Sequence, residues 1–140
     1  MTMASMTPRT PMAAERAAGR VELLVDQRWF TVCELTDLTP GRGVAALLPD
    51  GAQVAVFLDR SGRVYAIANR DPFTGAYVLS RGLLGSASGR PFVASPLLKQ
   101  RFDLETGRCL DDEGVVVQAY ATRTRAGTGT GAGAESAQVA

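Results

Sequence analysis

Two stretches of the sequence decide the fold: Asn69-Arg70-Asp71-Pro72-Phe73-Thr74-Gly75 and Ser95-Pro96-Leu97-Leu98-Lys99. Each contains a proline among small and polar residues, a composition typical of turns. Residues 65–68 before the first stretch and residues 101–104 after the second favour short strands. We therefore expect two loops that face each other, each at the end of a hairpin.

The sequence around these stretches predicts an antiparallel all-β domain. Pro49-Asp50-Gly51 and Asp59-Arg60-Ser61-Gly62 are turn signals between apolar runs, and they predict a meander. Several short strands separated by such turns favour a β-sandwich or partly open barrel with two loop-bearing hairpins. The glycine-rich residues 82–89 match no nucleotide-binding motif, and we expect a surface loop there. The expected strands are residues 29–33, 43–48, 53–58, 63–68, 100–104, 108–110 and 115–120.

The length of 140 residues and the composition indicate one domain between two unstructured ends. Residues 1–20 are rich in Met, Thr, Ala and Pro without strand alternation, and we expect them to be disordered. Residues 125–140 consist mainly of Gly, Thr and Ala, the composition of a flexible tail. The folded domain is expected at residues 21–124.

The two loop stretches resemble the cluster-binding half of a Rieske domain. In that family one loop carries Cys-x-His and the other Cys-Pro-x-His-Gly, followed by Phe-Asp and Thr-Gly. The resemblance places Asp71 and Phe73, and then Ser95 and Leu98, at the four ligand positions. A Rieske 2Fe-2S cluster needs two Cys and two His ligands, and the chain contains no His. The resemblance therefore implies a Rieske-like frame with no cofactor of its own.

Within that frame the sequence resembles the small subunits of assimilatory NAD(P)H-dependent nitrite reductases. The match rests on residues 44–56, 69–75, 78–85 and 95–99. The resemblance implies a cytoplasmic oxidoreductase of nitrate assimilation that reduces nitrite to ammonium. The large catalytic subunit would be the partner and would hold FAD, a 4Fe-4S cluster and sirohaem. This chain would contribute no catalytic residue.

Phe73, Leu97 and Leu98 are unusual because loop tips normally carry polar residues. They either fill the space that a cluster would occupy or form an exposed patch for a partner. Arg81 and Lys99 lie beside them in the sequence, together with Arg70 and Arg101. A basic rim around an apolar centre is typical of protein interfaces. We expect Phe73, Arg81, Leu97, Leu98 and Lys99 to contact the partner.

The composition excludes several classes of function. A chain without His has no His-based triad, zinc site or haem ligand. Cys33 and Cys109 are isolated, and we interpret them as buried apolar residues. A net charge of +1 gives no footprint for nucleic acid, and no apolar run approaches the roughly 20 residues that span a membrane. Two alternatives to a nitrite reductase subunit stay open: a Rieske-type 2Fe-2S ferredoxin and a free-standing β binding module.

Overall fold

The computed structural model describes residues 19–126 and 138–139. The expected disordered segment falls almost wholly on residues 1–18, and most of the expected tail falls on residues 127–137, both outside the described residues. The domain boundaries expected at residues 21 and 124 lie inside two paired strands, which extend to Gly19 and Ala126. Arg125 and Ala126 therefore belong to a sheet and not to a tail.

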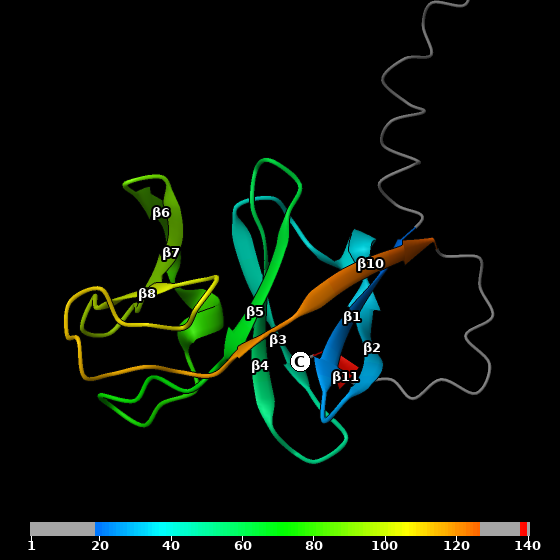
Figure 1. Ribbon diagram of the computed structural model, residues 1–140, viewed down its shortest axis with the longest axis horizontal. Coiled ribbons are helices and arrows are strands. Elements are labelled where there is room, and N and C mark those ends of the chain that lie inside the picture. The colour runs from blue at the N-terminus through cyan, green and yellow to red at the C-terminus, as the bar shows by residue number, and fades with distance from the viewer. Residues whose placement is uncertain (1–18, 127–137, 140) are drawn as a thin grey trace, which may run out of the picture.

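The described residues form three antiparallel sheets, which confirms the all-β prediction (Figure 1). The strand orders are β10-β1-β2, β11-β3-β4-β5-β9 and β6-β7-β8. In this part of the chain the sheets do not close into a barrel, and no helix is long and apolar enough to cross a membrane. The elements are β1 (Gly19–Val25), β2 (Arg28–Glu34), η1 (Leu35–Asp37), β3 (Arg42–Leu47), β4 (Gln53–Leu58), β5 (Val64–Ala68), η2 (Leu79–Arg81), β6 (Leu83–Ala87), β7 (Arg90–Ala94), β8 (Arg101–Asp103), β9 (Ala119–Tyr120), β10 (Thr122–Ala126) and β11 (Gln138–Val139).

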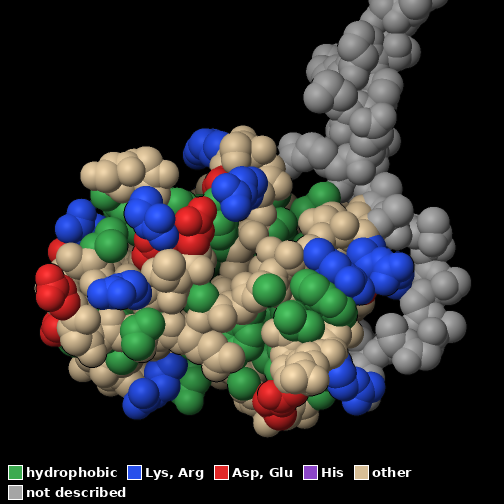
Figure 2. Space-filling view, viewed as in Figure 1, with side chains coloured by type: hydrophobic (Ala, Val, Ile, Leu, Met, Phe, Trp, Pro, Cys, Tyr) green, Lys and Arg blue, Asp and Glu red, His purple; other side chains and the backbone are tan. Residues whose placement is uncertain are grey.

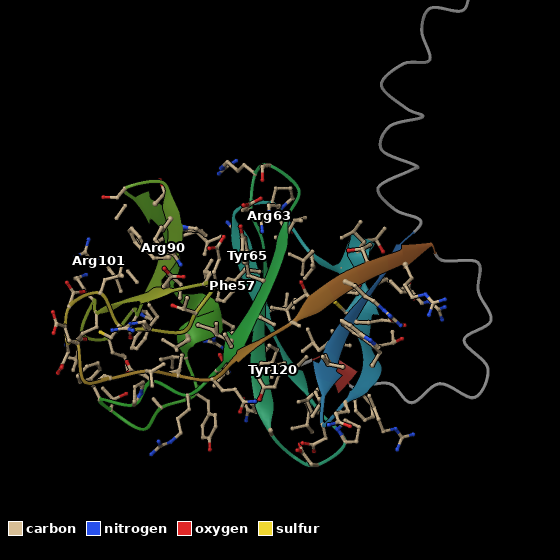
Figure 3. The ribbon with its side chains drawn as sticks, in the orientation of Figure 1. Phe57, Arg63, Tyr65, Arg90, Arg101 and Tyr120 are labelled. Carbon is tan, nitrogen blue, oxygen red and sulfur yellow. The ribbon has the colours of Figure 1, made fainter. Side chains whose placement is uncertain are left out.

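The central sheet is buried on both faces and separates two hydrophobic cores. Successive side chains of a strand point to opposite faces, so Val54 and Val56 of β4 enter a first core with β1 and β2. Ala55 and Phe57 enter a second core with β7 and β8. Figure 1 shows the corresponding layers, with β1, β2 and β10 on one side of β3–β5 and with β6–β8 on the other. Phe57 pairs in register with Tyr65 of β5, and both belong to the second core (Figure 3).

Three expectations about individual elements were wrong. The glycine-rich residues 82–89 do not form a plain loop, because β6 and β7 pair there as a hairpin. Its turn residues Ser88 and Gly89 both have positive φ, +53° and +79°, as a type I′ turn requires. Residues 108–110 form isolated bridges instead of a strand, and of residues 115–120 only Ala119–Tyr120 is a strand.

Candidate functional site

The first of the two predicted loops follows β5 and is closed by Asp71. The Asp71 backbone N–H donates to the Ala76 carbonyl at 2.8 Å, and the Gly75 N–H donates to the Asp71 carbonyl at 2.7 Å. Gly75 has φ of +81°, a conformation that glycine adopts without steric cost. The Asp71 Oδ1 accepts the Phe73 N–H at 2.8 Å. The sequence therefore fixes a tight loop around a buried carboxylate.

The second loop connects β7 to β8 and repeats the same pattern around Ser95. The Ser95 N–H donates to the Gln100 carbonyl at 2.8 Å, and the Lys99 N–H donates to the Ser95 carbonyl at 3.0 Å. Lys99 has φ of +69°, in the left-handed region that favours glycine. It occupies the position of the glycine in the resembling motif Cys-Pro-x-His-Gly. Lys99 thus adopts a conformation suited to glycine at the position where the motif has glycine.

The two loops are joined by a hydrogen bond between their first side chains. The Ser95 Oγ donates to the Asp71 Oδ2 at 2.6 Å, and both residues are buried. These are the two positions at which the resembling family places its Cys ligands. Sequence reasoning identified both positions but missed the bond. The sequence did contain a signal for this bond, because the corresponding positions of the two loops carry an acceptor, Asp71, and a donor, Ser95.

The other two positions that the resemblance assigns to cluster ligands, Phe73 and Leu98, have opposite environments. Phe73 is half-buried and packs against the second core, with its ring centroid 6.2 Å from that of Phe102. Leu98 has 54% of its surface exposed, and Leu97 has 49%. Phe73 therefore packs against the protein interior, whereas Leu97 and Leu98 are exposed on the surface.

The side chains at these positions do not fit a Rieske cluster. Such a cluster takes two thiolates and two imidazoles, whereas this site offers a carboxylate, a hydroxyl, a phenyl ring and an aliphatic chain. The chain's two thiols are buried in different cores, Cys33 in the first and Cys109 in the second. Burial, followed by the nearby carboxylates of Asp37 and Glu34, raises the pKa of Cys33 to about 12. Among the residues that the structure describes, no group of three or more His, Cys, Asp or Glu could hold a metal.

Basic side chains surround the loops only in part as expected. Arg101 is neutralised by Asp111, with Nη2 2.8 Å from Oδ1. Arg70, Arg81 and Lys99 are exposed, and none of them forms an ion pair with the acids in the described ranges. On the face shown in Figure 2, basic side chains are spread over the surface, and some lie next to one another or next to acidic side chains.

Comparison with known proteins assigns the chain to a family. A family model described as a Rieske-like 2Fe-2S domain matches residues 28–129. A nitrite reductase (NADH) small subunit from Salmonella typhimurium is 48% identical over 97 residues, which cover 69% of this chain and 89% of that protein. This chain belongs to the family of nitrite reductase small subunits. The resemblance stated from the loop residues is thereby confirmed.

Solved structures agree with this family assignment. The nitrite reductase small subunit from Erwinia carotovora is 49% identical, with a TM-score of 0.61 over 71% of this chain and 76% of that one. The ferredoxin of carbazole 1,9a-dioxygenase from Nocardioides aromaticivorans is more distant, at 31% identity and a TM-score of 0.52 over 73% of this chain and 84% of that one. The Rieske-like fold is therefore shared with small subunits and with a ferredoxin.

A further relative contains the same domain inside a much longer chain. The nitrite reductase NAD(P)H large subunit of Klebsiella oxytoca is 40% identical over 114 residues. The match covers 81% of this chain and 12% of that protein. A segment homologous to the small subunit is thus part of one large-subunit polypeptide.

Proposed function

We propose that this chain is a cluster-free accessory subunit of a cytoplasmic NAD(P)H nitrite reductase, an oxidoreductase that reduces nitrite to ammonium in nitrate assimilation. The family membership supports the nitrite reductase assignment. The single observation that carries the accessory role is the Ser95 to Asp71 hydrogen bond. It joins the two positions where a redox-active relative would bind iron.

The chemistry of those positions supports the proposal that no electrons pass through this chain. Neither a serine hydroxyl nor Leu98 replaces a thiolate or an imidazole on a Rieske iron. The redox groups, FAD, a 4Fe-4S cluster and sirohaem, would then belong to the large subunit. This chain would support that subunit through contacts, assembly or stability, without catalytic residues of its own.

The partnership with a large subunit is supported by the Klebsiella oxytoca relative. A covalent linker supplies only proximity between two domains. The contacts that hold the domain against the large subunit in the fused protein can therefore also hold two separate chains together. The half-exposed Leu97 and Leu98, with Arg81 and Lys99 beside their loops, form an apolar and basic surface suited to such a contact. Phe73 would not contact the partner directly but would support the first loop by packing against Phe102.

Purification from cells grown on nitrate tests this function. A tagged copy of the chain should recover a large sirohaem protein, and the recovered fraction should reduce nitrite with NADH or NADPH. Recovery of the chain alone, without activity, would remove the nitrite reductase assignment and leave a β binding module.

The second candidate function, a Rieske-type ferredoxin, is favoured by the likeness to the dioxygenase ferredoxin. The same preparation decides between the two. The chain separated from its partner should contain no stoichiometric iron and should lack visible absorption. A 2Fe-2S absorption spectrum with matching iron and sulfide would establish the ferredoxin instead.

A further inference from the structure

A groove runs along β3 on the side of η2 and β6, separate from the bond that joins the two loops. Three adjoining hollows form it, and neighbouring hollows share Gly41, Gly43, Ser80 or Arg81. The two larger hollows measure about 390 Å³ each. One of the two larger hollows is lined by Arg60 of the turn between β4 and β5 and by Leu84 and Pro91 of the β6–β7 hairpin. The length of the groove favours an extended ligand over a compact one.

Small residues of β3 and the preceding turn make room for this groove. A Cβ atom at Gly43 would lie 2.5 Å from the Phe57 ring and 2.8 Å from the Ser80 carbonyl oxygen, so only glycine lets η2 lie this close to β3. Gly41 has φ of +87°, and a Cβ there would lie 3.1 Å from Nη2 of Arg60. The Arg60 guanidinium therefore lies beside Gly41.

The charged lining of the groove is mostly basic. Arg42, Arg60 and Arg81 are exposed and line it, and none forms an ion pair with an acid in residues 19–126. Asp59 is the single acidic lining residue, and its Oδ1 already accepts hydrogen bonds from Ser61 and from the Arg63 N–H. Guanidinium groups bind carboxylates in a bidentate, directional way. The groove thus complements a ligand that carries several carboxylates.

The edge of β3 and the groove rim also suit an extended chain. β11 pairs with Ala46 and Leu47 of β3. On the same side, no strand of the described residues pairs with Arg42 to Ala45. Leu83 and Tyr77 line the groove with 78% and 52% of their surfaces exposed, which offers apolar contact beside the arginines. Partners that add a strand to an open edge combine backbone bonds with such side-chain contacts.

We propose that this groove is the docking site for an acidic, extended segment of the nitrite reductase large subunit. The carboxylates of that segment pair with Arg42, Arg60 and Arg81, and its apolar side chains cover Leu83 and Tyr77. The inference rests on the proposed function for the identity of the partner. It goes beyond that function by placing the contact in the groove and by specifying the partner's charge.

Charge reversal in the groove tests the proposal. The affinity of the full-length chain for the purified large subunit is measured by calorimetry for wild type, for Arg42→Glu/Arg81→Glu and for Arg28→Glu/Arg125→Glu. The last variant reverses two exposed arginines on β2 and β10, outside the groove. The groove variant should bind at least about tenfold more weakly, because each exposed ion pair is worth up to about fivefold and reversal adds repulsion. The control variant should bind like wild type.

Salt and crosslinking give independent readouts. The affinity of the wild type for the large subunit should fall as the salt concentration is raised, and this dependence should be weaker in the neutral variant Arg42→Gln/Arg81→Gln. The neutral variant also replaces the charge-reversed variant in the affinity comparison if the latter does not fold. A photoreactive amino acid at Leu83 should crosslink to a segment of the large subunit rich in Asp and Glu. Crosslinking to a segment without acidic residues would overturn the proposal.

The outcomes separate this inference from the function on which it rests. If both groove variants bind the large subunit as tightly as the wild type does, the groove is not the docking site, and the accessory function is unaffected. A wild-type chain that does not bind the large subunit at all would refute both.

Discussion

At the scale of single residues, Asp71 and Ser95 join the two loops through buried polar side chains. A buried polar group must be hydrogen-bonded, because burial without a partner costs free energy. Asp71 meets this requirement with one oxygen on the Phe73 N–H and the other on the Ser95 hydroxyl. One side-chain bond therefore joins the two positions that the resemblance assigns to Cys ligands.

Replacement of Ser95 by alanine should destabilise the fold. The Asp71 carboxylate oxygen would lose its donor at a site with no exposed surface, which costs about 1–3 kcal/mol of the free energy of unfolding. Urea denaturation measures this loss. Ser86→Ala on the exposed part of β6 is the matched control, and it should change stability by less than about 0.5 kcal/mol. A Ser95→Ala variant as stable as the Ser86→Ala control would contradict the role of the bond.

At the scale of elements, turn chemistry decided which parts of the fold were predictable. Strands β3, β4 and β5 were predicted because Pro49-Asp50-Gly51 and the Asp59 turn have familiar signals, and Asp59 does accept the N–H groups of Ser61 and Arg63. The β6–β7 hairpin was missed because Ser88-Gly89 is a weaker form of the usual Asn-Gly signal. β1 was missed because its turn to β2, Asp26-Gln27 with φ of +52° and +68°, lacks the glycine that usually marks such a turn. Its second pairing, with β10, joins opposite ends of the domain, and local patterns do not report such contacts. For the same reason the sequence located Asp71 and Ser95 but not their bond.

The β6–β7 hairpin is tied to the last residue of β8 by an ion pair that should make stability pH-dependent. Arg90 Nε lies 2.5 Å from Oδ2 of Asp103, and Arg90 projects from the hairpin side of the molecule in Figure 3. Burial acts to raise the pKa of Asp103, but hydrogen bonds from Arg90 and from the Glu105 and Thr106 N–H groups outweigh it and lower the pKa below 3.8. The stabilisation is therefore complete above pH 3.8 and is lost as the pH falls through the folded-state pKa.

Substitution of Arg90 by glutamine tests this linkage. The variant should be less stable than wild type at neutral pH, and the difference should shrink once the pH falls below the pKa of Asp103. Urea titrations at a series of pH values measure both effects. Arg108→Gln, at an exposed arginine without an ion pair in the described residues, should show no such pH-dependent difference. A gap between wild type and Arg90→Gln that is constant with pH would show that Asp103 does not respond to Arg90.

At the scale of the whole molecule, the two cores share the strands that lie between them. β4 contributes Val56 to the first core and Phe57 to the second, and both side chains are fully buried. Neither core can lose its packing without disturbing the same backbone. We infer that the domain unfolds as one cooperative unit although it consists of three sheets.

The two thiols provide a probe of each core, and they should report the same opening event. Both thiols are buried, and burial, with Asp37 and Glu34, also raises the pKa of Cys33 to about 12, so Cys33 offers a thiol reagent neither access nor thiolate. Single-thiol variants, Cys109→Ala for the first core and Cys33→Ala for the second, should resist labelling in buffer and react fully in strong denaturant. In moderate denaturant each should label at a rate set by global unfolding, once corrected for the stability that the substitution itself removes. The raised pKa leaves stability unchanged below the unfolded value of 9.0 and lowers it as the pH rises from 9.0 toward about 12, so global unfolding and the labelling of Cys33 should both increase over that range. If the corrected labelling rates of the two variants differ, the two cores open separately, and β4 stays packed against one core while the other opens.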